Sequence, residues 1–305
     1  MLTISPRAND QRKEQRSMEI SSEVIKRLRD KTGAGMMDCK RALEASNGDI
    51  DAAIEYLRKK GAAVGQKRAD RSAKEGMIVT RVTPDSKCGV AVEVNCETDF
   101  VGRSDDFVAF AGLVAETVLR DRPASVDALP ALKTPSGKTL AELLNDLLAK
   151  VGEKLEIRRF QIVDAPGGMV SSYTHLGSKI GVLVEFAGLD PTGADAIVGR
   201  DVAMQVAAMS PLVVSREQIA KSMIDQELEI YRTQAKNEGK KEQVIERIAS
   251  GRLEKFYQEV CLMDQTFIKD PGKTIKDVLL DAGKASGKQI SIRRFVRFHL
   301  GEEGK

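Results

Sequence analysis

Apolar positions change their period along this chain, and the changes outline its organisation. Residues 18–61 carry apolar side chains at helical spacing, beginning with Val24, Ile25 and Leu28. Two short breaks that contain glycine divide this stretch into three helices, and Gly61 is expected to end the third. The pattern predicts a small three-helix module, at the low end of independent stability.

After a small, basic stretch at 62–75, which reads as a linker or an exposed helix, the apolar period changes to two. Two blocks then show the same order of elements. The first block, residues 76–165, predicts strands at 77–82 and 88–96, helices at 107–119 and 140–151, and a strand at 155–163. The second block, residues 166–305, predicts strands at 169–173 and 180–186, helices at 194–208 and 275–282, and a strand at 290–298. Each block should form an antiparallel three-stranded sheet with helices on one face, so the expected fold class is α+β.

The two blocks are copies of one unit. The segment SKCGVAVEV, which begins at Ser86, returns as SKIGVLVEF at Ser178, an offset of 92 positions. Residues 137–160 return as 272–295 without a gap, at an offset of 135 positions. We interpret the features that the copies share as scaffold, and the features that differ as candidates for function.

The second copy contains an insertion. From Pro211 to Ile292 is 81 positions, whereas from Pro123 to Ile157 is 34, a difference of 47. The extra residues fall around 215–260, where two charged segments with one apolar stripe each flank a glycine-containing break. We expect a helical hairpin that projects from the second copy as an antiparallel coiled coil.

A second difference follows the shared central strand. The first copy continues as NCETDFV from Asn95, whereas the second continues as AGLDPTG from Ala187, an ordinary turn. A lone phenylalanine after a strand is usually a core residue that closes over the sheet, and Phe100 on its own favours that interpretation. However, Phe107 and Phe110 already supply bulk to the following helix, and the second copy lacks the segment.

The alternative is that this segment contacts another protein. An aspartate beside an aromatic residue at a strand–helix corner suits insertion into a groove, because the ring provides apolar contact and the carboxylate accepts hydrogen bonds. The candidate residues are Thr98, Asp99, Phe100 and Val101.

Met36 and Met37 present a similar ambiguity. Two successive residues of a helix cannot both face the core of a small bundle. One methionine should therefore be buried, and the other should lie exposed as a soft contact surface.

Composition narrows the classes of function. The net charge is +3, aromatic residues make up 4% and tryptophan is absent, which argues against DNA or other nucleic acid as the main partner. No apolar run approaches the length of a membrane span, so no membrane association is expected. The four cysteines show no C-x-x-C pair and the only histidines are His175 and His299, so we expect no metal site and a reducing, cytoplasmic setting. Residues 1–17 are polar without an apolar face and are expected to form a disordered tail.

Two Gly-Lys-Thr sequences suggest nucleotide binding, but their context favours a structural role. A P-loop also needs a glycine five residues earlier, where Leu132 and Phe267 stand. Thr139 and Thr274 each precede an acidic residue by three positions, the spacing of a helix capping box, and the motif recurs at the repeat offset. We therefore expect no direct nucleotide binding and no cofactor.

Signatures of catalysis are also missing from the sequence. It contains no G-x-S-x-G motif and no histidine beside a candidate nucleophile, so the chain is not expected to be an enzyme. His175, in the segment Ser-Tyr-Thr-His with Tyr173, is interpreted as a surface or interface residue.

Several long motifs occur in the order found in the elongation factor Ts family. The segment VIKRLRDKTGAGMMDCK from Val24, the run EVNCETDFV from Glu93, IGVLV from Ile180 and GRL from Gly251 closely resemble that family. The resemblance covers about residues 18–301. It implies a guanine-nucleotide exchange factor for the GTPase elongation factor Tu, with an N-terminal module like the ubiquitin-associated domain, two related subdomains and a coiled-coil hairpin.

The resemblance also implies roles for individual residues. The Asp-Phe pair of the family intrudes beside the nucleotide site of the GTPase and disturbs its magnesium ion, which carries over to Asp99 and Phe100, flanked by Thr98 and Val101. The N-terminal module holds a helix of the GTPase domain, and the second subdomain contacts another domain of the partner. These contacts carry over to the following positions: Arg29, Met36, Met37 and Lys40 in the module, and Tyr173 and His175 in the second subdomain. The rival hypothesis is an adaptor or RNA-binding accessory protein built on the same module.

Overall fold

The computed structural model describes residues 20–67 and 71–302, so the expected tail at 1–17 lies outside the described residues. The chain begins with a three-helix bundle composed of α1 (Ser22–Thr32), α2 (Met36–Ala45) and α3 (Ile50–Lys67). Its core contains Leu28, Cys39 and Leu43, none of which is accessible to solvent. The bundle confirms the three helices that the sequence pattern predicts.

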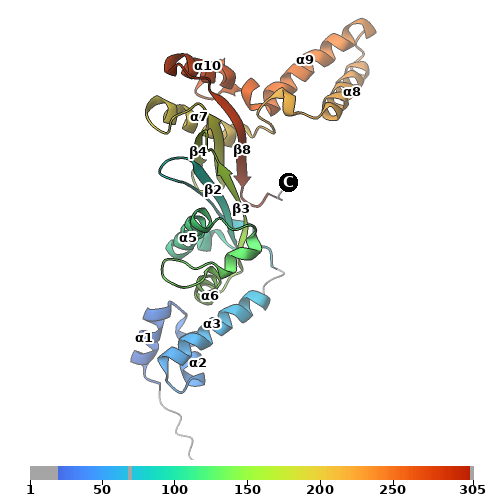
Figure 1. The fold of residues 1–305 in the computed structure, drawn as a ribbon. Helices are drawn as coiled ribbons and strands as arrows, with labels where there is room; N and C mark the ends of the chain where they lie inside the picture. The colour runs from blue at the N-terminus through green and yellow to red at the C-terminus, as the bar shows by residue number, and fades with distance from the viewer. Residues whose placement is uncertain (1–19, 68–70, 303–305) are drawn as a thin grey trace, which may run out of the picture.

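Helix α3 is longer than expected, because it continues past Gly61 to Lys67. Gly61 lies where α3 crosses α6 (Leu140–Val151), and a Cβ on this residue would come within 2.6 Å of the carbonyl oxygen of Asn145. The glycine therefore permits close packing of two helices instead of ending one. Part of the segment expected to be a linker is helical, and the module rests against the first copy (Figure 1).

The first copy forms the antiparallel sheet β1-β2-β3, with strands Glu75–Val82, Cys88–Cys96 and Leu155–Asp164. One face is covered by α5 (Asp105–Asp121) and α6, which bury Phe107, Val114 and Leu140 against the sheet. The one-turn helix α4 (Asp99–Gly102) follows β2, and the 3₁₀ helix η1 (Val126–Ala131) joins α5 to α6.

The second copy forms the antiparallel sheet β4-β5-β8, with strands Gly168–Thr174, Ile180–Ala187 and Ser291–His299. Helices α7 (Gly193–Met209) and α10 (Ile275–Ser286) pack on one face. The hairpin β6 (Thr266–Phe267) and β7 (Asp270–Thr274) and the 3₁₀ helices η2 (Arg216–Gln218) and η3 (Leu262–Asp264) complete this half. Both copies confirm the predicted α+β architecture.

The two sheets associate through their remaining faces in a nearly symmetric arrangement. The amide of Ile78 donates to the carbonyl of Ser178, and the amide of Val170 donates to the carbonyl of Ser86, each over 2.7 Å. These four positions are related by the offset of 92. Gly89 and Gly181 let the sheets approach, because a Cβ on either would meet a side chain of the other copy at less than 3 Å. The duplicated sequence is therefore a duplicated structure with one shared core.

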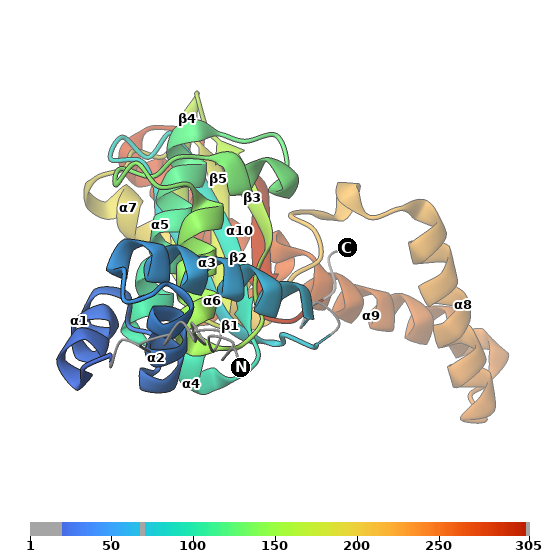
Figure 2. The same ribbon diagram turned by 90° about the horizontal axis from the view of Figure 1, so that it is seen from below.

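The insertion forms two antiparallel helices, α8 (Lys221–Asn237) and α9 (Glu242–Val260), which extend from the second copy away from the sheets (Figures 1 and 2). The helices meet through Ala235, Ile245 and Ala249, which are buried. Arg232 bonds Glu246 across the hairpin at 2.7 Å. The helical hairpin predicted at residues 215–260 is present, and its helices span residues 221–260.

Candidate functional site

Helix α4 presents the side chain of Phe100 to solvent. The ring is 85% exposed, whereas Val101 beside it packs against the core of the first copy. Burying a phenylalanine side chain is worth about 1.5–3 kcal/mol, and this ring gains nothing of that from the fold itself. The interpretation of Phe100 as a core residue is therefore wrong, and the ring remains available for a contact outside the chain.

The base of this segment is held by Glu153, which lies in the turn before β3 and which the sequence reasoning missed. One carboxylate oxygen accepts the amide of Thr98 at 3.0 Å, and the other accepts its hydroxyl at 2.7 Å. The Thr98 hydroxyl in turn accepts the amide of Val101 and caps α4. No feature of the local sequence identified Glu153, because it is 55 positions away from Thr98.

Cys96 supports the same turn from the side that faces the protein core. Its thiol donates to the carbonyl of Thr98 at 3.1 Å, and its sulfur lies 3.3 Å from where a Cβ on Gly102 would be. Burial, with smaller contributions from the nearby carboxylates of Glu153 and Glu75, raises the pKa of Cys96 to about 12. The thiol is a structural hydrogen-bond donor under a tightly packed turn.

Asp99 lies at the first position of α4, where the helix dipole favours a carboxylate. It pairs with Arg103 at 3.0 Å, and both side chains are substantially exposed. Water screens such a pair, so a competing positive group can replace Arg103 at little cost. The segment thus combines an exposed ring and an exchangeable carboxylate on a fixed base.

The predicted residues of the N-terminal module all lie on its surface. Arg29 is in the last turn of α1 and Lys40 is in α2, and both are exposed. Met36 and Met37 occupy the first turn of α2 and are 43% and 63% exposed. The expectation that one methionine faces the core is wrong, because Cys39, Ala42 and Leu43 form the buried face of this helix.

Tyr173 and His175 lie together where β4 leads into the turn before β5. The Tyr173 hydroxyl and His175 Nδ1 are 3.1 Å apart. The next residue, Leu176, is 92% exposed, which makes it a further candidate contact that the sequence reasoning did not single out. The three predicted sets therefore lie on separate elements. The first is on α1 and α2, the second on α4, and the third on the end of β4 and the turn that follows it.

Both Gly-Lys-Thr sequences form capping boxes, as predicted. Thr139 and Glu142 satisfy each other's backbone amides at the start of α6, and Thr274 and Asp277 do the same for α10. Over residues 20–67 and 71–302, no cluster of three or more histidine, cysteine, aspartate or glutamate side chains is arranged to hold a metal ion. No helix within these ranges is both long and apolar enough to cross a membrane.

Comparison with known proteins places this surface in a family. The family model described as "Elongation factor TS" matches residues 97–302, a range that includes α4, the last strand of the first sheet and the whole second sheet. Elongation factor Ts of Chloroherpeton thalassium is 46% identical over 290 residues, which cover 93% of this chain and 99% of the relative. The chain belongs to the elongation factor Ts family. The elongation factor Ts proteins of Clostridium perfringens (45% identical, 93% of each chain) and Chlorobium limicola (47% identical, 93% of this chain and 99% of the relative) agree with this assignment.

Membership of the elongation factor Ts family gives the chain a role as a translation elongation factor. The resemblance noted from the sequence motifs is confirmed over most of the chain. The exposed α4 segment lies within the part that the elongation factor Ts model matches.

Proposed function

We propose that this chain is a guanine-nucleotide exchange factor that binds elongation factor Tu carrying GDP and promotes release of the nucleotide. The single observation that carries the proposal is the exposure of Phe100 on a fixed base, next to the replaceable carboxylate of Asp99. The chain acts in the cytoplasm, by binding alone and without enzymatic chemistry, a cofactor or a nucleotide of its own.

The mechanism follows from thermodynamic linkage. A factor that binds the nucleotide-free GTPase more tightly than the GDP-bound form must weaken GDP binding by the same ratio. Burying the Phe100 ring in the partner supplies about 1.5–3 kcal/mol, which is roughly a ten- to hundredfold change in GDP affinity. In this proposal Asp99 exchanges Arg103 for groups that order the magnesium shell of the partner.

Two further surfaces anchor the complex. The N-terminal module, which we take to be like the ubiquitin-associated domain, contributes Arg29, Met36, Met37 and Lys40. The end of β4 contributes Tyr173, and the turn before β5 contributes His175. Exposed methionines suit such a contact, because their unbranched side chains adapt to an apolar helix surface. The α8–α9 hairpin, which we regard as a coiled coil, is assigned no part in GDP release.

The test is stopped-flow release of a fluorescent GDP from elongation factor Tu. The wild-type chain should accelerate release, and the double variant D99A/F100A should bind the partner but release GDP far more slowly. Release at the wild-type rate by the double variant would show that Asp99 and Phe100 do not drive GDP release. Binding by the wild-type chain without any acceleration would instead support the adaptor or RNA-binding alternative.

A further inference from the structure

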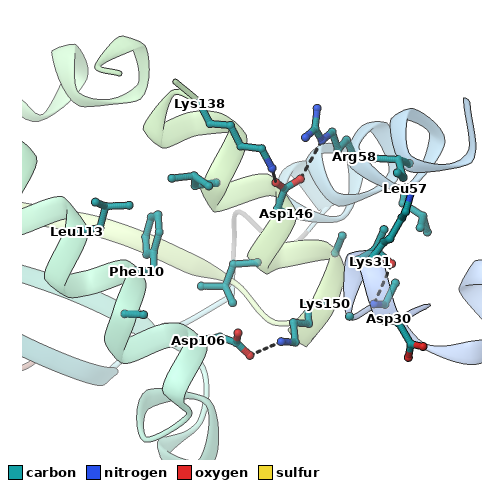
Figure 3. Close-up of a pocket in the computed structure, with 18 residues that line it drawn as sticks. Asp30, Lys31, Leu57, Arg58, Asp106, Phe110, Leu113, Lys138, Asp146 and Lys150 are labelled. Atoms are coloured by element: carbon teal, nitrogen blue, oxygen red, sulfur yellow. Dashed lines mark hydrogen bonds and ion pairs between the residues drawn. The ribbon is translucent and has the colours of Figure 1, made fainter. Parts of the chain in front are cut away.

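A cavity of about 690 Å³ lies between the N-terminal module and the first copy. Helices α1 and α3 form one wall, and α5 and α6 form the other (Figure 3). The cavity is lined by apolar side chains such as Leu57, Phe110 and Leu147, and by the charged side chains of Asp106, Asp146 and Lys150 among others. The module is therefore joined to the first copy by the packing of α3 on α6 and by contacts between side chains that line this cavity.

Lys150, at the end of α6, makes the contact at one edge. Its ammonium group forms an ion pair with Asp106 in the first turn of α5 (Figure 3). Its aliphatic stem crosses the α1–α2 turn, where a Cβ on Gly33 would come within 2.8 Å of the Lys150 Cε. Gly33 has a φ of +69°, so a glycine suits both the backbone conformation and the space that the lysine occupies. One side chain thus connects its own helix, α6, to two other elements, α5 and the α1–α2 turn.

These elements are the ones that carry the candidate contacts. The α1–α2 turn joins α1, which carries Arg29, to α2, which carries Met36, so Lys150 contacts the connection between the two helices that carry the anchoring residues. Asp106 is two positions after Ser104, whose hydroxyl caps α5 and also donates to the carbonyl of Val101 at 2.7 Å. A short path of contacts therefore runs from the anchors, through Lys150, to the base of the Phe100 segment.

The opposite edge of the cavity acts as the pivot. There Asp146 of α6 bonds both Arg58 of α3 at 3.0 Å and Lys138 at 2.8 Å, and α3 packs on α6. A helix pair that touches along one line can still tilt about that line. The contact of Lys150 with Gly33 lies on the far side of the cavity and opposes the tilt.

We propose that Lys150 is a positioning residue that fixes the N-terminal module relative to the Phe100 segment, so that both surfaces meet the partner as one rigid unit. The inference rests on the proposed exchange function for its consequence, although the fixation itself does not depend on it. If the two surfaces are held rigidly, binding of the module to the partner also positions Phe100 for its contact. Insertion of the Phe100 ring then costs no further orientational entropy.

The experiment measures orientation and activity separately in the full-length chain. Spin labels are attached at R27C on α1 and E116C on α5, two exposed positions, and the distance distribution is recorded by pulsed electron resonance. All four native cysteines are buried, so the parent chain without added cysteines serves as the labelling control. Exchange is measured as GDP release from elongation factor Tu over a range of factor concentrations.

The variants separate the stem of Lys150 from its charge. K150A should broaden the distance distribution and lower the maximal rate of GDP release by about tenfold, as expected for a misplaced group. K150R should restore both, because it keeps a long stem and a positive charge. K59A is the matched control, because Lys59 is an exposed lysine of α3 that pairs along its own helix with Glu55.

An unchanged distance distribution in K150A would overturn the proposal. A broadened distribution with an unchanged maximal rate would also overturn it, because the module would then be free without consequence. Failure of the wild-type chain to accelerate GDP release is a different result, since it rejects the exchange function while the distance measurement still reports whether Lys150 fixes the module.

Discussion

The turns that follow the central strands of the two copies differ in the placement of one hydrophobic side chain. In the first copy the turn forms α4 and exposes Phe100 by 85%. In the second copy the corresponding segment buries Leu189, which is 3% exposed, and Gly188 adopts a φ of +82° to let the chain bend close to Gln289. After the same central strand, the second copy thus forms a closed turn that buries Leu189, and the first copy forms a turn that exposes the ring of Phe100.

The two turns are nevertheless tied down from equivalent positions. Glu153 holds Thr98 in the first copy, and Lys288 forms an ion pair with Asp190 in the second. Both pairs are related by the repeat offsets, since Glu153 and Lys288 are 135 positions apart and Thr98 and Asp190 are 92 apart. We call these two pairs clamps, because each ties a turn to the segment before the last strand of its copy. The clamp of the first copy is a hydrogen bond beneath an exposed side chain, and the clamp of the second copy is an ion pair at a closed turn.

The largest effect on stability is expected for Leu189, the buried side chain in the turn of the second copy. L189A removes a core side chain, and we expect a loss of about 2–5 kcal/mol in the free energy of unfolding. Chemical denaturation measures this loss. A change near zero would mean that the second turn does not need its hydrophobic residue, and the contrast with the first turn would fail.

F100A should show the opposite behaviour. We expect the free energy of unfolding to change by no more than about 0.5 kcal/mol because the ring is exposed. Acceleration of GDP release should fall by roughly ten- to hundredfold. V108A, at another exposed apolar position on α5, is the control and should leave release unchanged. Equal losses in both variants would show that the effect is not specific to the ring.

The clamps provide the next comparison. E153Q should weaken the bonds to Thr98, and we expect GDP release to slow by about three- to tenfold, in line with the loss of a charge-assisted hydrogen bond. K288M should leave release unchanged, since its partner Asp190 lies in the closed turn. If K288M slowed release as strongly as E153Q, the distinction between the two clamps would be lost.

The capping boxes of α6 and α10, which both copies share, should respond alike to mutation. T139A and T274A each remove one capping box, and we expect each to lower the free energy of unfolding by about 1 kcal/mol. Neither variant should alter the binding of GDP to elongation factor Tu. The wild-type chain itself should bind no GDP, so neither variant should lose any GDP binding. A calorimetric titration in which the wild-type chain binds GDP and T139A does not would revive the phosphate-binding interpretation.

The smallest effect concerns Cys96, whose counterpart in the second copy is Gly188. With its pKa raised to about 12 by burial, only about one part in ten thousand of the thiol is ionised at pH 8. A maleimide reagent at that pH should therefore modify the native chain very slowly, and urea should remove the protection. Rapid modification of Cys96 in the native chain would show that the base of α4 opens.

Local sequence determined most of the fold. The period-two blocks and helical stripes predicted the six strands of the two main sheets and their covering helices to within a few residues, because each element buries one regular face. The repeat identified Thr139 and Thr274 as caps, since capping depends only on a partner three positions away. The α4 segment was singled out because it differs between otherwise similar copies.

The sequence could not show what depends on distant contacts. Whether Phe100 points inward or outward depends on how Val101, Cys96 and Glu153 fill the space beneath it. Gly61 was read as the end of a helix, because a glycine in a helix and a glycine after a helix look alike until the neighbouring helix is in place. Both cases involve partners far away in the chain.

The sequence by itself therefore determined which elements form, that the chain is duplicated, and where the copies differ. Hydrogen bonds within a turn and apolar periodicity act over a few residues, and these are visible in the order of amino acids. Only the tertiary structure decided that Phe100 is exposed, that both methionines of α2 face solvent, and that Lys150 joins the module to the first copy. Those outcomes depend on space already filled by residues from other elements.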